Sequence, residues 1–248
     1  MLAAVARGLD SLLFPESCIV CRLPLEGPGW PACLSCAETF PAPAPPWCAL
    51  CGIPLPSFRD APEPAGSGNG NSCAQCRRTP PSFDGAVSPF LYSGPVRTMI
   101  HGFKYQGRIA WTGSLARRMA EKVREHLGER PADGCAAVPL HPVRRRERTF
   151  DQAERLAKGV AGELGLPYLP GLLVKTTATP PQVELDRTER FRNVRGAFQL
   201  GRSAPRIAGS RLLLVDDVLT TGATAGACAQ VLKGAGAANV FVVTAARG

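Results

Sequence analysis

The sequence lacks both of the best-known phosphate-binding loops. No segment matches G-x-x-x-x-G-K-[ST], and none matches G-x-G-x-x-G. These absences argue against P-loop ATPases and against dinucleotide-binding enzymes of the Rossmann type. Any phosphate-binding site in this chain must therefore be of another kind.

Long apolar runs are also absent. No stretch stays apolar for the roughly 20 residues that a membrane-spanning helix needs. The segment from Met1 to Phe14 contains Arg7 and Asp10 and has no small-residue cleavage site, so it does not resemble a secretory signal. We therefore expect a cytoplasmic protein with no membrane span. The amphipathic spacing of this segment predicts a docking helix rather than a membrane anchor, through Leu2, Val5, Leu9, Leu12 and Leu13.

Cysteine is concentrated near the amino terminus, where eight of the ten cysteines fall before residue 77. They form four C-x-x-C pairs, Cys18/Cys21, Cys33/Cys36, Cys48/Cys51 and Cys73/Cys76. Each pair offers two thiolates to one tetrahedral ion, so the four pairs predict two Cys₄ zinc sites. A disulfide framework is the alternative, but it is typical of secreted chains.

The sequence leaves open how the pairs combine. We favour linear order, with one ribbon from Cys18 to Cys36 and a second from Cys48 to Cys76, because the Pro-rich link Pro41–Pro46 separates two self-contained units. A crossed order would join alternate pairs. The insert from Pro54 to Ser72 is then a mobile loop of the second ribbon. Four cysteine ligands leave no open coordination position, so both zinc ions should be structural.

The composition changes where the cysteines stop. A boundary near Pro80-Pro81 gives an N-terminal helix and double zinc ribbon over residues 1–81 and a second domain over residues 82–248. The formal net charge is +9, and two Cys₄ zinc sites would lower it to about +5. The basic residues form two clusters, one of Arg144, Arg145, Arg146 and Arg148 and one of Arg187, Arg190, Arg192 and Arg195. Such clusters bind pyrophosphate or nucleic acid, or only keep a protein soluble.

The most informative segment is R-L-L-L-V-D-D-V-L-T-T-G-A-T, from Arg211 to Thr224. Its apolar run Leu212–Val215 predicts a buried strand of a parallel sheet, and ligands bind at the carboxyl ends of such strands. There, Asp216 and Asp217 can bind vicinal hydroxyls and Mg²⁺. The small-residue turn that follows can bind a phosphate at the amino end of a helix, through Thr220, Thr221, Gly222, Ala223 and Thr224. The segment resembles the phosphoribosyl pyrophosphate (PRPP) signature of type I phosphoribosyltransferases.

A second anion site is predicted at the same edge of the sheet. The run Cys135–Leu140 predicts a strand, and Asp151 is the predicted cap of a helix that extends to about Leu164. The connection between them should emerge beside the paired acids. We assign a pyrophosphate to its basic residues and to one lysine, namely Lys104, Arg144, Arg145 and Arg148. A solvated loop without a ligand is the alternative.

Other patterns complete an α/β domain. They predict strands over Ala86–Tyr92 and Val240–Thr244 and helices over Ile109–Leu127 and Ala223–Lys233. Residues 175–198 show little periodicity and many charges, which is typical of a functional loop or lid. We therefore predict a type I phosphoribosyltransferase-like parallel sheet flanked by helices, with a small N-terminal double zinc-ribbon domain.

The chain as a whole resembles the ComF family. The resemblance rests on the cysteine pairs and on V-D-D-V-L-T-T-G-A-T. It also rests on Y-S-G-P-V-R-T-M-I-H-G-F-K-Y-Q-G from Tyr92, V-P-L-H from Val138 and R-T-F-D-Q-A-E-R-L-A from Arg148. The spaced residues Thr179, Gln182, Leu185, Arg190, Asn193, Val194 and Phe198 are similar to the flexible-loop segment of the family. One departure is R-T-F-D-Q, because the family commonly has R-G-F-N-Q there.

This resemblance implies a role in competence, the uptake or processing of transforming DNA, with competence proteins as partners. It also implies Mg²⁺-PRPP as a ligand. Three hypotheses follow: an active PRPP-dependent pentosyl transferase, a PRPP or nucleotide sensor without turnover, and an accessory protein that binds single-stranded DNA through its zinc ribbons and basic loops.

The sequence shows no obvious general base for a purine acceptor. Hypoxanthine-type transferases resemble this motif but have an aspartate base where this chain has Thr220. Histidine is scarce, and the three residues, His101, His126 and His141, are better explained as hydrogen-bonding groups. The acceptor therefore stays unassigned.

Overall fold

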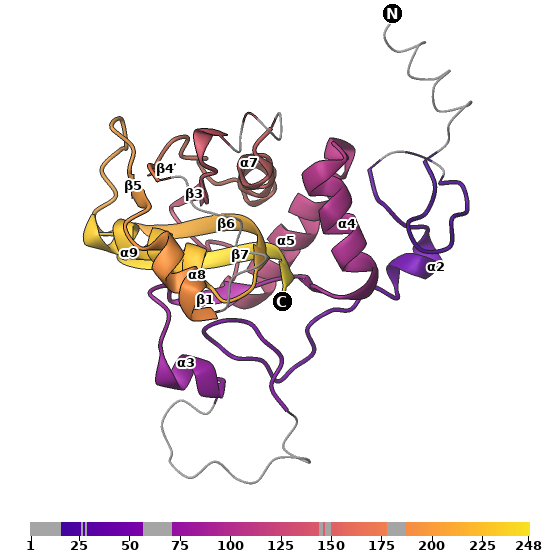
Figure 1. Ribbon diagram of the computed structural model, residues 1–248, viewed down its shortest axis with the longest axis horizontal. Coiled ribbons are helices and arrows are strands. Elements are labelled where there is room, and N and C mark those ends of the chain that lie inside the picture. Colours follow the sequence, from indigo (N-terminus) through magenta and orange to yellow (C-terminus); the bar gives the residue numbers. More distant parts are fainter. Residues whose placement is uncertain are drawn as a thin grey trace, which may run out of the picture.

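The chain is organised around one parallel sheet (Figure 1). The computed structural model describes residues 16–25, 27, 29–56, 71–143, 146, 150–177 and 187–248. The predicted docking helix and most of the predicted insert of the second ribbon lie outside these residues.

The main sheet has five strands in the order β1-β7-β6-β3, and β2 also pairs with β7. The two longest strands lie side by side at its centre, β6 (Arg211–Leu219) and β7 (Asn239–Arg247). The shorter strands are β1 (Gly85–Val87), β2 (Phe90–Leu91) and β3 (Gly134–Ala137). Every pairing in this sheet is parallel, so the carboxyl ends of β3 and β6 meet at one edge.

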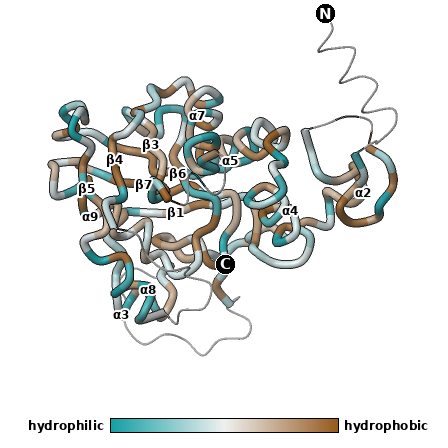
Figure 2. Tube along the Cα trace, turned by 45° about the horizontal axis from the view of Figure 1, so that its top comes forward, coloured by the Kyte–Doolittle hydropathy of each residue, from teal (hydrophilic) through white to brown (hydrophobic). Residues whose placement is uncertain are grey.

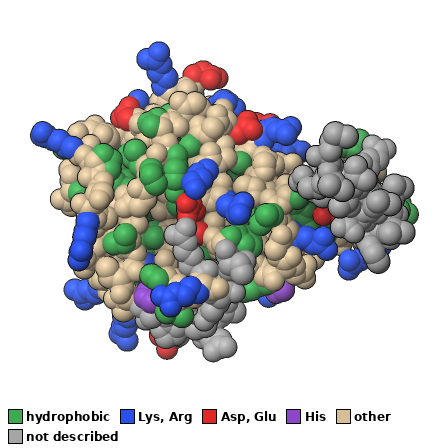
Figure 3. All heavy atoms as spheres, turned by 90° about the horizontal axis from the view of Figure 1, so that it is seen from above, with side chains coloured by type: hydrophobic (Ala, Val, Ile, Leu, Met, Phe, Trp, Pro, Cys, Tyr) green, Lys and Arg blue, Asp and Glu red, His purple; other side chains and the backbone are tan. Residues whose placement is uncertain are grey.

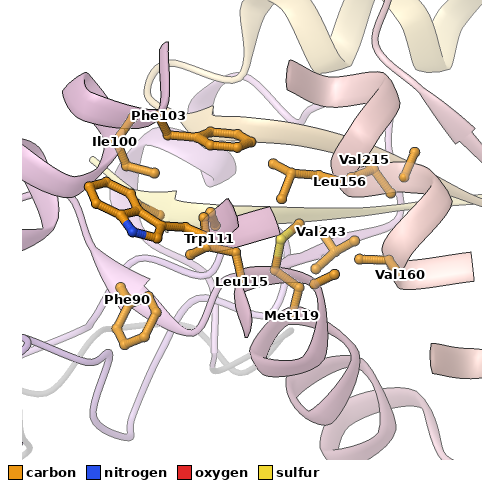
Figure 4. Packing of buried hydrophobic residues seen from close by; sticks show 14 of the residues in the cluster. Phe90, Ile100, Phe103, Trp111, Leu115, Met119, Leu156, Val160, Val215 and Val243 are labelled. Atoms are coloured by element: carbon orange, nitrogen blue, oxygen red, sulfur yellow. The ribbon is translucent and has the colours of Figure 1, made fainter. Parts of the chain in front are cut away.

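One face of the sheet is covered by three helices, α4 (Gly94–Tyr105), α5 (Thr112–Leu127) and α7 (Gln152–Leu164). Leu213 and Val215 of β6 belong to the buried cluster on this face, together with Val243 of β7. Figure 4 shows Val215 and Val243 beside Leu156 and Val160 of α7. Burial of each such side chain contributes about 1.5–3 kcal/mol to stability.

The opposite face is covered by α8 (Arg187–Val194) and α9 (Ala223–Gly234). Leu212 and Leu214 pack in this second cluster, so alternate residues of β6 enter different cores. Figure 2 shows the hydrophobic colouring of the central strands. This arrangement confirms the predicted parallel sheet with helices on both sides.

The helix after the predicted connection is also confirmed. Asp151 caps α7, because its side chain accepts a hydrogen bond from the backbone N–H of Glu154 at 3.0 Å. The helix ends at Leu164, where Gly165 adopts the left-handed conformation. A 3-10 turn over Ile109–Trp111 precedes α5, which refines the predicted helix.

Several elements differ from the prediction. β3 ends at Ala137 rather than Leu140, and β7 continues past Thr244 to Arg247. β6 continues past Val215 to Leu219, so both acids lie within the strand. The strand predicted over Ala86–Tyr92 is divided into β1 and β2, with Pro89 between them, because proline cannot donate a ladder hydrogen bond. The predicted lid contains α8, and its ends form an antiparallel pair, β4 (Leu173–Lys175) and β5 (Phe198–Leu200).

The cysteine-rich segments pack on the sheet domain at two different places. The first includes the short helix α2 (Leu34–Ala37) and lies beside α4 (Figure 1), where Cys18 and Phe40 join the cluster of Trp111. The second includes α3 (Ala74–Arg78) and lies against β1, where the backbone of Gly52 approaches the Ala86 carbonyl. Within the described residues, no helix is both long and apolar enough to span a bilayer.

Two glycines of α7 give a matched test of helix packing. A Cβ at Gly159 would lie 2.6 Å from the Cβ of Ala116 on α5, whereas a Cβ at Gly162 would meet no atom within 4 Å. Gly159→Ala should destabilise the protein by about 1–3 kcal/mol because α5 and α7 must separate. Gly162→Ala should stabilise it by about 0.5–1 kcal/mol. Urea unfolding measures both, and equal midpoints for the two variants would contradict this packing.

Candidate functional site

The eight paired cysteines form two groups in the order that we favoured. Each group brings its four Sγ atoms within 4.8 Å of one another, Cys18, Cys21, Cys33 and Cys36 in one and Cys48, Cys51, Cys73 and Cys76 in the other. The Sγ–Sγ distances Cys21–Cys33 and Cys51–Cys73 are both 3.8 Å. Four sulfurs at about 2.3 Å from a central zinc ion stand about 3.8 Å apart. Both groups therefore fit a tetrahedral ion.

The protonation of these thiols also favours a cation. Burial alone would raise the pKa of Cys18, but hydrogen bonds from backbone N–H groups lower it to about 6. Similar bonds overcome burial at Cys48 and lower its pKa to about 7. The hydrogen bond with Cys33 raises the pKa of Cys36 to about 12. Four thiolates this close together cannot all ionise without a positive ion among them.

The turn after β6 has the backbone of an anion site. Gly222 is the N-cap of α9 with a φ of 79°, a conformation that favours glycine. Its carbonyl accepts the first helical bond from the Gly226 N–H at 2.8 Å, and the Thr221 hydroxyl accepts from the Ala223 N–H at 3.3 Å. The first N–H groups of a helix have no partner within it, so this turn presents the positive end of α9.

The two acids occupy different environments. Asp217 is only 9% exposed, and its Oδ1 lies 2.8 Å from the Nζ of Lys104 on α4. Asp216 is partly exposed, and its Oδ1 accepts the Asp217 N–H at 2.8 Å. Successive strand residues face opposite sides, so the carboxylates are not a parallel pair. Lys104, which we assigned to a pyrophosphate, thus lies at the acids.

The pKa of Asp216 is clearly shifted. Burial, followed by the negative charge of Asp217, raises the pKa of Asp216 to about 8. The positive charge of Lys104 acts in the opposite direction. A group that donates hydrogen bonds, such as a sugar hydroxyl, would stabilise the ionised form and lower this pKa.

One residue at the turn has no predicted role. The guanidinium of Arg190 on α8 donates to the Thr220 hydroxyl at 3.3 Å. The sequence places Arg190 in a basic cluster, but only the position of α8 beside α9 brings it to this turn. A fixed positive charge beside helix N–H groups strengthens a phosphate site.

The predicted pyrophosphate arginines are not placed. Arg144, Arg145 and Arg148 lie outside the described residues. Their neighbour Arg146 lines a hollow of about 720 Å³ together with Leu140, Asp151 and Lys175. On the face shown in Figure 3, the described Lys and Arg side chains are scattered rather than gathered in one patch.

Curated relatives cover almost the whole chain. It is 32% identical over 236 residues to the DNA utilization protein YhgH of Salmonella typhimurium, which spans 93% of this chain and 96% of that protein. It is 28% identical over 238 residues to competence protein F of Haemophilus influenzae, with 94% and 98% covered. The chain belongs to the ComF family. This membership confirms the resemblance; no protein-family model matches the chain.

Solved phosphoribosyltransferase structures align with part of this ComF-family chain. One is the glutamine PRPP amidotransferase from B. subtilis, at 21% identity and a TM-score of 0.37, covering 58% of this chain and 30% of that one. Another is a purine phosphoribosyltransferase from Pyrococcus horikoshii, at 17% identity and a TM-score of 0.32, covering 56% and 84%.

Metal content tests the two cysteine groups. We expect two equivalents of zinc per chain, and Cys33→Ser or Cys73→Ser should each leave one, because each removes one ligand from one group. Cys228→Ala removes a buried thiol outside both groups and should leave two equivalents. Elemental analysis of the purified variants gives the count, and unchanged zinc in Cys73→Ser would exclude that residue as a ligand.

Stability should depend on pH through Asp216. The folded carboxyl keeps its proton up to about pH 8, whereas its ordinary pKa is 3.8, so the folded state binds more protons between these values. Stability of the ligand-free protein should therefore fall as the pH rises from about 4 to about 8, and Asp216→Asn should remove that part of the fall.

Thermal unfolding across this range measures the effect. The control is Asp133→Asn at the opposite end of β6, where the N–H of Arg211 lowers the pKa of the carboxyl. This control should keep the decline of the wild type. A profile for Asp216→Asn that matches the wild type would contradict the raised pKa.

Proposed function

We propose that the chain binds a 5-phosphorylated ribose, with Mg²⁺-PRPP as the ligand, at the turn between β6 and α9. The observation that carries the proposal is the sequence of parts at the sheet edge: two acids on a buried strand, a glycine turn with a φ of 79°, and the open end of a helix. Acids accept hydrogen bonds from hydroxyls and helix N–H groups bind phosphate, so the parts match the two ends of the ligand.

Different residues bind the phosphate, ribose and pyrophosphate parts of the ligand. The 5-phosphate binds the N–H groups and hydroxyls of Thr220, Thr221, Gly222, Ala223 and Thr224. The ribose hydroxyls donate to Asp216 and Asp217. Lys104 lies 2.8 Å from Asp217, and we assign its positive charge to the ligand's pyrophosphate. Arg190 adds positive charge at Thr220. Arg144, Arg145 and Arg148 stay predicted pyrophosphate residues.

Asp216 and Asp217 would hold Mg²⁺, which would supply charge neutralisation for the pyrophosphate leaving group. The chain's own residues hold the sugar and orient its 5-phosphate. A pentosyl transferase needs this arrangement, and so does a PRPP sensor without turnover.

We place this ligand binding in DNA uptake or utilisation. The support is family membership together with relatives named as competence and DNA utilization proteins. A direct contact with single-stranded DNA, partners among competence proteins and a cytoplasmic location stay predictions.

Calorimetric titration with Mg²⁺-PRPP tests the proposal. The wild type should bind, and Asp216→Asn combined with Asp217→Asn should weaken binding by at least about a hundredfold, since hydrogen bonds to charged groups contribute about 1.5–3 kcal/mol each. Asp133→Asn is the control, because Asp133 directly precedes β3 and pairs with Arg211 at the other end of β6. If the wild type does not bind PRPP, the proposal is wrong.

Pyrophosphate release then separates turnover from sensing. Wild-type protein with Mg²⁺-PRPP is mixed with a panel of nucleobases, and released pyrophosphate is measured. Release that depends on one base and is lost in the double variant identifies a transferase. Binding without release for every base identifies a sensor.

A further inference from the structure

Arg247 connects the second cysteine group to the phosphate turn. It lies at the end of β7 and is only 7% exposed, although it carries a full positive charge. A buried charge is costly unless hydrogen bonds and opposite charges surround it. The partners of Arg247 therefore indicate what it does.

On one side, the guanidinium is bound to the second cysteine group. Its Nε donates to the Cys51 carbonyl at 2.6 Å, and one terminal nitrogen lies 3.5 Å from the Cys51 Sγ. Four thiolates around Zn²⁺ carry a net charge of about −2, which Arg247 partly neutralises.

On the other side, the same guanidinium is bound to the start of the turn. Its other terminal nitrogen donates to the Leu219 carbonyl at 2.8 Å and to the Thr220 carbonyl at 2.7 Å. These two residues immediately precede the N–H groups that we assign to the 5-phosphate. The direction of the Thr220 carbonyl fixes the peptide plane that leads into Thr221.

A cavity of about 470 Å³ borders both sites and is lined by Cys51, Phe83, Thr221, Gly222 and Arg247, among others. Within the described residues, Arg247 is the side chain that hydrogen-bonds to both the second cysteine group and the turn. The first cysteine group packs instead on the cluster of α4 and α5.

We propose that Arg247 is a positioning residue through which the second metal site controls phosphosugar affinity at the turn. The inference rests on the proposed function. With metal bound, Cys51 holds the guanidinium, and the guanidinium holds Leu219 and Thr220 in the binding conformation. Loss of the metal frees Cys51, so the guanidinium is no longer fixed against the Thr220 carbonyl, while the Leu219 carbonyl keeps the Gly248 N–H as a donor at 2.9 Å. By linkage, the phosphosugar must also tighten metal binding.

A double-mutant cycle tests the coupling in the full-length protein. The ligand is ribose 5-phosphate, which occupies the acids and the turn but not a pyrophosphate site. Arg247→Lys keeps the charge but cannot reach both sides at once, and Cys73→Ser removes a metal ligand of the second group. Each should weaken ribose 5-phosphate binding by about tenfold or more. The combined variant should bind as weakly as either single variant, because both break the same connection.

Arg211→Lys is the matched control. It is the same substitution at the opposite end of the central strands, where Arg211 pairs with the exposed carboxylate of Asp133. It should leave the affinity within about twofold of the wild type. Thermal unfolding of each variant sets an assay temperature at which all are folded.

Cobalt provides a second measurement that does not depend on variants of the second group. Co²⁺ in place of zinc gives thiolate absorption bands that report on the cysteine groups. Ribose 5-phosphate should shift these bands in the wild type and in Arg211→Lys but not in Arg247→Lys. A residue that only stabilises the fold would lower the melting temperature without removing this response.

The outcomes separate the two proposals. If the wild type does not bind ribose 5-phosphate or PRPP, the proposed function fails and the coupling fails with it. If the wild type binds but Arg247→Lys and Cys73→Ser bind equally well, only the coupling is wrong. Additive losses in the double variant, or an unchanged cobalt spectrum in the wild type, also overturn it.

Discussion

The loss of water around two neighbouring acids is the constraint on which the site depends. Leu212–Val215 must be buried on both faces for the sheet to form, and this burial extends to Asp217, whereas Asp216 stays partly exposed. Lys104 compensates Asp217, and nothing of comparable charge lies as close to Asp216 among the contacts described above. The carboxylates at the end of β6 can therefore accept further hydrogen bonds. The first N–H groups of α9, next to them, can instead donate hydrogen bonds to a negative group. A molecule with hydroxyls at one end and a phosphate at the other satisfies both.

Much of this arrangement could be predicted because it is local in the sequence. Three features each depend on residues that are only a few positions apart: the apolar run of β6, the Asp151 cap and the spacing within each cysteine pair. The linear grouping of the cysteines followed from the Pro-rich link between the pairs. Family membership and the parallel sheet could be inferred for the same reason, since the motifs that carry them are continuous segments.

The parts that were missed depend on contacts between distant segments. The helix α4 has buried residues at Val96, Met99, Ile100 and Phe103, and this helical spacing lies inside the family motif that begins at Tyr92. Arg190 reaches Thr220 only because α8 packs beside α9. Arg247 resembles any residue at the end of a strand until the second cysteine group is placed against it. Side-chain partners separated by 30 or more residues leave no local pattern to read.

The position of the second cysteine group has one more consequence. β1 is an outer strand of the main sheet, and the segment that contains Gly52 lies directly against its Ala86 carbonyl. A free strand edge presents unpaired backbone groups that can recruit strands of other molecules. The second cysteine segment thus also covers the edge of β1. Without metal, this edge would be exposed, and we expect the protein to self-associate through it.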